Sequence, residues 1–205
     1  MPVIDLTRHA YEDLTIETKH LPLQSNKTKY TGVLYQYHLG SMDFSYIDFP
    51  GHILETDDGV TAAKVNIEDF YRVPATVIRM DLPNNFGGVT REMLEYACGG
   101  VPQTPAVIIN ALGDLDPRDI ELRSVWLTMD AVDWLIESGC KLIVSDIYES
   151  QSLEGVFYKF FQAGIATVCE PVNLGKINSR QIRLSVIFQP IEATQVPCRI
   201  LGEYW

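Results

Sequence analysis

The stretch MDFSYIDFPGH, from Met42 to His52, holds the residues whose types and spacing best suit chemistry at one place. If 42–48 is a strand, Met42, Tyr46 and Asp48 lie on one face, because side chains alternate along a strand. A proline two residues after Asp48 then ends regular pairing, so His52 projects beyond the strand end. Asp48 and His52 are therefore the predicted catalytic pair, with the carboxylate orienting an imidazole that acts as a general base.

A strand face of two histidines and an aspartate at this spacing would bind Zn or Mn well. Here the two histidine positions hold Met42 and Tyr46. A thioether is a poor ligand for such ions, and a phenol must lose its proton from a pKa near 10 before it binds one. The residues thus predict no metal site. Tyr46 either donates a hydrogen bond to a substrate carbonyl or fills space, and Asp48 is either catalytic or held by backbone donors.

The same stretch resembles the motif H-x-G-T-H-x-D-x-P-x-H of the cyclase family, which includes bacterial kynurenine formamidases (arylformamidases). Asp48, Pro50 and His52 match that motif as they stand. The resemblance extends to VIDLT, AVIINALGD, WLTMDAVDWLIESGCKLIVSDIYES and AGIATVCEPVNL, in the family's order. It implies a single cyclase-like domain over 1–205, of α/β class with a swivelling β/β/α arrangement, and a Zn- or Mn-dependent hydrolysis of amides or lactones.

The departures from the family motif fall on its metal ligands. Besides Met42 and Tyr46, Cys169 stands where the resemblance places a glutamate ligand, with Glu170 one position away. A further family histidine falls near Tyr158. A gapped alignment on HLGSM, with His38 in place of a ligand, is the open alternative. We expect the altered site to keep its position in the fold and to bind substrate there. The predicted substrate-binding residues are therefore Tyr46, Met42, Tyr158, Cys169 and Glu170.

Two functions from different classes follow from these residues. The first is a divergent cyclase-family hydrolase that acts on an amide, lactone or related carbonyl without a full metal site. The second is a non-catalytic pseudoenzyme that binds a small molecule or forms oligomers. Cys169 beside Glu170 is either a thiol nucleophile or a buried inert cysteine, since a reactive thiol needs a basic partner.

The overall composition excludes several partners. A net charge of −11 at pH 7 repels a phosphate backbone, so nucleic-acid binding is not expected. No apolar stretch is long enough to span a membrane, and the first residues lack the pattern of a signal peptide. Four widely spaced cysteines favour reduced thiols and a cytoplasmic location. The family resemblance implies a homodimer or homotetramer, and the expected partner is a small carbonyl compound.

The pattern of apolar residues predicts a mixed sheet with β-rich ends and helices in the middle. Helices are expected at 89–100, 127–139 and 152–164, where apolar residues recur at helical spacing between caps and glycines. Short apolar runs bounded by turn residues predict the strands. These runs are 2–6, 30–39, 42–49, 59–65, 75–82, 105–112, 140–147, 181–191 and 198–205, with a solvated turn at 24–29.

Overall fold

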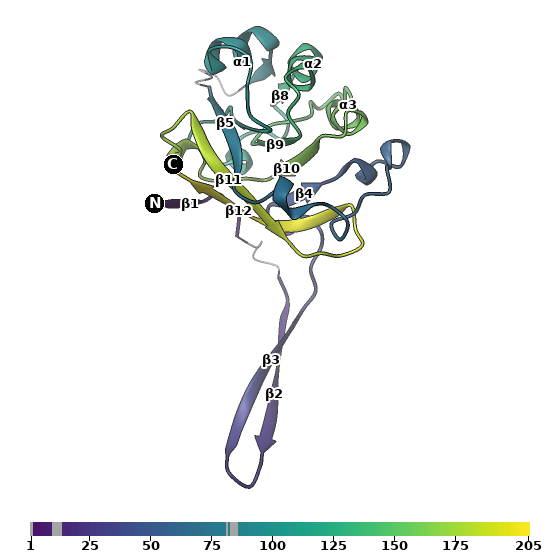
Figure 1. Cartoon of the computed structure of the whole chain (residues 1–205), viewed down its shortest axis with the longest axis vertical. Helices are drawn as coiled ribbons and strands as arrows, with labels where there is room; N and C mark the ends of the chain where they lie inside the picture. Colours follow the sequence, from purple (N-terminus) through teal and green to yellow (C-terminus); the bar gives the residue numbers. More distant parts are fainter. Residues whose placement is uncertain (1, 10–13, 81, 83–85) are drawn as a thin grey trace.

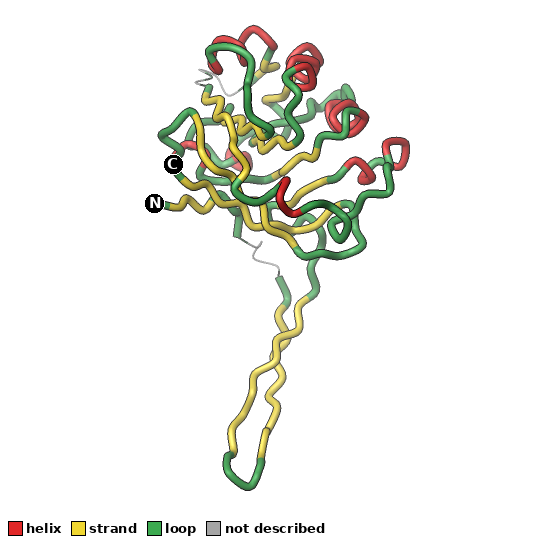
Figure 2. Tube along the Cα trace, viewed as in Figure 1, coloured by secondary structure: helices red, strands yellow, loops and turns green. Residues whose placement is uncertain are grey.

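The structure is a computed structural model that describes residues 2–9, 14–80, 82 and 86–205. Its body is a mixed sheet covered by helices (Figures 1 and 2). The strands of this sheet follow from the apolar runs in the sequence. They are β1 (Val3–Asp5), β4 (Tyr46–Asp48), β5 (Val73–Arg79), β7 (Ala106–Asn110), β9 (Leu142–Ser145), β10 (Ala166–Cys169), β11 (Gln181–Phe188) and β12 (Gln195–Glu203).

The sheet closes on itself. Its order is β1-β12-β11-β5-β7-β9-β10-β4, and β4 also pairs with β12, so the strands from β12 round to β4 form a barrel-like ring. The run β5-β7-β9-β10 is parallel, and the remaining pairs are antiparallel. Closure leaves β4 bonded on both edges, which fixes the short strand that carries the predicted catalytic aspartate.

Side chains of the parallel strands alternate between two cores. Ile108, Val144 and Val168 point into the ring, where they pack with apolar residues of β11 and β12. Val107 and Ile143 point to the other face, beneath the helices. Because these strands are buried on both faces, their sequences are continuous apolar runs rather than alternating ones.

The helices α1 (Arg91–Cys98), α2 (Met129–Glu137) and α3 (Val156–Gln162) line one side of the sheet (Figure 1). The first two confirm the predicted helices, and Thr90 caps α1 by accepting a hydrogen bond from the backbone N–H of Met93 at 3.4 Å. The third was predicted from Ser152 but begins at Val156. The Glu149 carboxylate accepts hydrogen bonds from the backbone N–H groups of 154–156, so the helix starts where that carboxylate holds the chain.

Two predicted strands differ from the structure. The segment 59–65 is a turn region rather than a strand. Its first two backbone N–H groups, those of Gly59 and Val60, donate to the carboxylates of Asp57 and Asp58, and such local hydrogen bonds stabilise turns. The segment predicted as a strand from Met42 is a strand only over β4. The Asp43 carboxylate accepts a hydrogen bond from the N–H of Gly40 at 2.6 Å and closes a turn, so Met42 does not share a strand face with Asp48. Residue 81 of the predicted 75–82 strand lies outside the described residues.

A long hairpin stands out from the body (Figure 1). It consists of β2 (Ile16–Gln24) and β3 (Lys29–Tyr37), paired along their whole length, with the predicted turn at 24–29 between them. The sequence predicted β3 but not β2, because the run Glu17–His20 is polar and Pro22 is unusual within a strand.

Smaller elements complete the chain. The strands β6 (Gly87–Val89) and β8 (Val125–Leu127) pair beside the helices. Short 3-10 helices are η1 (Pro50–His52), η2 (Leu54–Thr56), η3 (Ile67–Asp69), η4 (Pro117–Asp119) and η5 (Leu174–Lys176). Within the described residues, no helix has both the length and the apolar character to cross a bilayer. The mixed α/β class is confirmed, and the swivelling β/β/α arrangement stays a prediction.

Candidate functional site

The site is built around β4, whose three residues alternate between the two cores. Ile47 points into the ring, while Tyr46 and Asp48 point to the helix side. On β10, Cys169 stands opposite Tyr46 and Thr167 stands opposite Asp48. This antiparallel register brings residues more than a hundred positions apart onto one polar patch beneath α3.

Asp48 is 3% exposed, so its carboxyl group is almost removed from water. Its Oδ2 accepts a hydrogen bond from the Cys169 thiol, with Sγ and Oδ2 3.7 Å apart. Its Oδ1 is buried and has no hydrogen-bond partner among the described residues. Burial raises the pKa of Asp48, and the neighbouring Gln195, His52 and Cys169 offset this only in part. Burial thus shifts this carboxyl group towards its protonated form, in which it can donate a hydrogen bond.

Burial acts in the same direction on the neighbours of Asp48. Burial raises the pKa of the Tyr46 phenol far above its ordinary value, and the nearby Cys169 and Asp48 raise it further. Burial likewise raises the pKa of the Cys169 thiol. Tyr148 lies next to these side chains. Its hydroxyl donates to backbone carbonyl oxygens, 2.9 Å from that of Val168 and 3.0 Å from that of Ile143. Burial therefore favours the uncharged forms of Tyr46, Asp48 and Cys169.

His52 ends η1 and is the exposed member of the site. Its Nε2 lies 3.3 Å from Nε2 of Gln195, and its ring meets Phe161 edge-on at 6.4 Å. The donor in this contact depends on the tautomer of the ring and on the orientation of the amide. The Ser41 hydroxyl donates to Oε1 of Gln195. Gln195 thus orients the imidazole, the part that the sequence had predicted for Asp48.

Gln195 is the residue that sequence reasoning missed. It pairs with Asp48 across the β4–β12 ladder, so it lies between the carboxyl group and the imidazole. No local signal marks it, because it lies 143 positions from His52 along the chain. Only the closure of the ring brings the two together.

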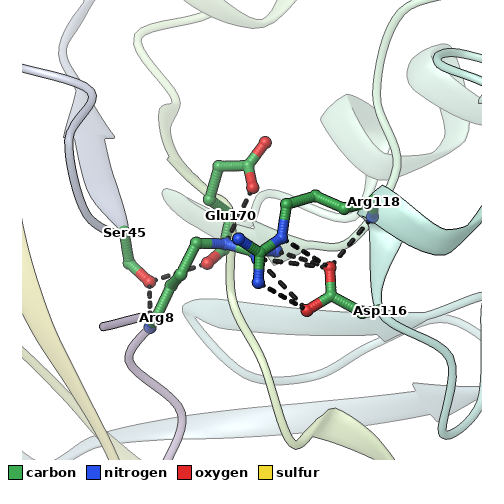
Figure 3. Close-up of polar contacts among 5 residues, drawn as sticks. All are labelled: Arg8, Ser45, Asp116, Arg118 and Glu170. Carbon is green, nitrogen blue, oxygen red and sulfur yellow. Dashed lines mark hydrogen bonds and ion pairs between the residues drawn. The ribbon is translucent and has the colours of Figure 1, made fainter. Parts of the chain in front are cut away.

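Glu170 belongs to an ionic cluster with Arg8 and Asp116 (Figure 3). Its Oε2 lies 2.9 Å from Nε of Arg8, an ion pair by distance without an aligned hydrogen bond. Arg8 is 2% exposed and also binds both carboxylate oxygens of Asp116. The Ser45 hydroxyl joins this cluster to β4 by accepting from the backbone N–H of Arg8 and donating to the carbonyl of Glu170. The contacts of Glu170 are therefore structural, and its predicted substrate contact stays a prediction.

The other two predicted substrate-binding residues lie at the edge of the site. Met42 is 54% exposed in the turn beside Ser41, which itself contacts Gln195. Tyr158 is 40% exposed on α3, the helix that packs against η1 and η2. Both side chains are open to solvent.

Comparison with known proteins decides the family. The family model described as "Putative cyclase" matches residues 4–150. The chain belongs to this cyclase family. A search of curated protein sequences finds no match.

Solved structures agree with the cyclase-family fold. Isatin hydrolase A from Ralstonia solanacearum superposes with a TM-score of 0.74 at 18% identity, over 98% of this chain and 91% of that one. Isatin hydrolase A from Labrenzia aggregata, bound to benzyl benzoate, gives 0.73 at 16% identity over 98% and 93%. A "predicted metal-dependent hydrolase" from Bacillus stearothermophilus gives 0.67 at 15% identity over 98% and 97%. At these identities the likeness concerns the fold.

The residues of this cyclase-family member do not fit a Zn or Mn centre. Within the described ranges, no group of three or more His, Cys, Asp or Glu side chains is close enough to hold a metal ion. Around Asp48 the donors are a phenol, a thiol and an amide, while the imidazole contacts Gln195. A catalytic Zn site ordinarily takes three imidazole, thiolate or carboxylate ligands.

Proposed function

We propose that this protein binds a small amide, lactone or related carbonyl compound and hydrolyses it without a metal ion. One observation carries the proposal: Tyr46 and Asp48 share one face of β4 beside an exposed histidine, and burial raises the pKa of both. Neutral donors in a dry site are suited to a carbonyl oxygen on which negative charge develops.

The proposed reaction divides the work between His52 and the two donors. The oxygen of a water molecule attacks the carbonyl carbon, and His52 accepts the proton that this water loses. The Tyr46 hydroxyl and the protonated Asp48 donate to the oxygen of the tetrahedral intermediate. When the intermediate collapses, the C–N or C–O bond breaks and His52 returns the proton to the leaving amine or alcohol.

The substrate class rests on the family and its named structures. Two structural neighbours are isatin hydrolases, and the sequence resemblance includes arylformamidases. Isatin, N-formyl aryl amides and small lactones are therefore the probes. The exposed Met42 and Tyr158 at the edge of the site are suited to contact an apolar ring.

The test is hydrolysis of these three probes by the full chain, in the presence and absence of a metal chelator. The proposal expects turnover that the chelator leaves unchanged and that His52→Ala abolishes. His20→Ala, which changes an exposed histidine on the hairpin, is the matched control and retains full turnover. Turnover that requires added Zn or Mn, or that survives His52→Ala, would contradict the proposal.

A non-catalytic binding protein is the second candidate. Asp48 is 3% and Cys169 5% exposed, and each already has the other as a partner. This candidate expects a probe to raise the melting temperature without being consumed. Turnover of any of the three probes decides against it.

A further inference from the structure

Two buried oxygen atoms on neighbouring strands have no hydrogen-bond partner among the described residues. They are Oγ1 of Thr167 on β10 and Oδ1 of Asp48 on β4. Thr167 is 0% exposed and Asp48 is 3% exposed. The two residues stand directly opposite each other in the antiparallel β4–β10 register. Directly opposed residues have Cβ atoms about 4.5–5.5 Å apart, so the two side chains are immediate neighbours.

Both side chains point to the same side of the sheet. Tyr46 and Cys169 pack in the core beneath the helices. Asp48 and Thr167 lie two positions away from them on the same two strands, which places them on the same face. On the other side of Thr167, the next residue of this row is Ile143 of β9, which has no polar side chain. Within the row, Asp48 is therefore the polar neighbour of Thr167.

The hydroxyl of Thr167 needs an explanation because the rest of its strand is apolar. The strand consists of Ala166, Thr167, Val168 and Cys169, all of them buried. A valine has nearly the same shape and is equally common in strands, and it would leave no polar atom unsatisfied. Buried hydroxyl groups ordinarily have a hydrogen-bond partner, either protein or water. A polar atom at this depth beside a second one indicates a site for a small polar group.

The two oxygens are suited to bind one further oxygen atom between them. Oδ2 of Asp48 already accepts from the Cys169 thiol, so Oδ1 is the oxygen left to carry a proton and to donate it. The Thr167 hydroxyl can donate or accept. The pair can therefore donate to a water molecule and accept from it, and it can offer two donors to a carbonyl oxygen.

We infer that Thr167 is a further catalytic residue, whose hydroxyl and Asp48 Oδ1 together bind the carbonyl oxygen of the substrate. This inference rests on the proposed function. In the free protein a water molecule takes this position, and the carbonyl oxygen displaces it and takes over its hydrogen bonds. The carbonyl group enters from the side of Tyr46, which is half-buried, and His52, which is exposed. Thr167 donates to the carbonyl oxygen as negative charge develops there, while the attack by water and the proton transfers through His52 are unchanged.

Hydrolysis of isatin, N-formyl aryl amides and small lactones by three variants tests this role. Thr167→Val removes the hydroxyl, and we expect kcat to fall about 100-fold while KM changes less than about threefold. Thr167→Ser keeps a hydroxyl and should retain kcat within about tenfold of the unaltered chain. Thr76→Val is the matched control, because Thr76 is a buried threonine of β5 whose hydroxyl bonds to that of Thr104. It should lower the melting temperature and keep turnover, whereas Thr167→Val should keep the melting temperature and lose turnover.

Crystal structures of the free full chain and of its Thr167→Val variant give a readout that needs no turnover. We expect an ordered water molecule within hydrogen-bond distance of Thr167 Oγ1 and Asp48 Oδ1, and its loss in the variant. A direct hydrogen bond between the two side chains, with no water between them, would overturn the inference. Full turnover by Thr167→Val would also overturn it and would leave the proposed function standing. If the unaltered chain hydrolyses none of the probes, the proposed function fails, and the catalytic role of Thr167 fails with it.

Discussion

The Cys169 thiol donates to the Asp48 carboxyl group across the β4–β10 ladder, with Sγ and Oδ2 3.7 Å apart and both side chains nearly buried. Burial raises the pKa of both groups. Asp48 raises the pKa of the thiol further, while the hydrogen bond from Cys169 lowers the pKa of Asp48 in part. Burial therefore favours the uncharged form of each group, and the proposed function rests on these uncharged side chains.

Asp48→Asn should preserve the site. An asparagine is neutral like a protonated aspartic acid and keeps both an acceptor for Cys169 and a donor. We expect unfolding free energy within about 1 kcal/mol of wild type and turnover within about tenfold, measured by chemical denaturation and probe hydrolysis. Asp48→Ala removes the acceptor and leaves a void, so it should cost about 1–3 kcal/mol. If Asp48→Asn were as inactive as Asp48→Ala, the carboxylate would have to be ionised to act.

Cys169 should be inert in the folded protein. A nucleophilic thiol must reach the thiolate, and burial raises the pKa of Cys169 instead. We expect iodoacetamide at pH 8 to label the half-buried Cys98 well before Cys169, as read by mass spectrometry of the native chain. Cys140, which is also buried, serves as the internal control. Rapid labelling of Cys169 alone would revive the thiol-nucleophile hypothesis.

Arg8 should be a stability residue. It is buried against Asp116 and Glu170. Its loss would take the cation from Glu170, while Asp116 would retain its ion pair with Arg118. We expect Arg8→Met to lower the free energy of unfolding by about 2–3 kcal/mol. This is no more than the smallest losses typical of a broken buried ion pair, because both carboxylates are partly exposed. Lys64→Met breaks an exposed ion pair with Glu192 and should cost less than about 1 kcal/mol. Equal losses in thermal melts would show that the Arg8 cluster adds no more than a surface pair.

Asp146 should make stability fall as pH rises. Its carboxylate accepts backbone hydrogen bonds from Ala111 and Leu112, yet burial raises its pKa from 3.8 to about 6. Between these values the unfolded chain has lost its proton while the folded chain keeps it, so unfolding free energy decreases with increasing pH. The full effect is at most about 3 kcal/mol. Asp146→Asn should flatten this decrease between pH 4 and 6, and an unchanged pH profile would contradict the shift.

The sequence could bring Asp48 and His52 together as a candidate pair because they are close in the chain. Asp48 and His52 lie within five positions of each other, and the alternation that carries Tyr46 and Asp48 to one face survives in the short β4. Met42 was misplaced because the Asp43 and Ser45 side chains bond to the backbone and divert the chain before the strand begins. Hydrogen bonds from side chains to the backbone compete with strand pairing, and the spacing of apolar residues does not reveal this competition.

The remaining features depend on contacts that are distant in sequence. Gln195 reaches His52 only through the β4–β12 pairing, and Glu170 turns to Arg8 with a φ of 57°. Strand β2 of the projecting hairpin was not predicted. It buries neither face, so its sequence does not need to alternate apolar and polar residues. The helices and the parallel strands β5, β7 and β9 were predicted because caps, glycines and apolar runs mark them locally, whereas β10 was not among the predicted strands.

The metal content of the chain, purified without chelator, tests the central claim most directly. Elemental analysis should find Zn and Mn at far below one ion per chain, with chelator leaving hydrolysis of the probes unchanged. A stoichiometric Zn or Mn ion that is lost in Asp48→Ala would contradict the account, because the phenol, thiol and carboxyl group would then act as ligands rather than as neutral donors.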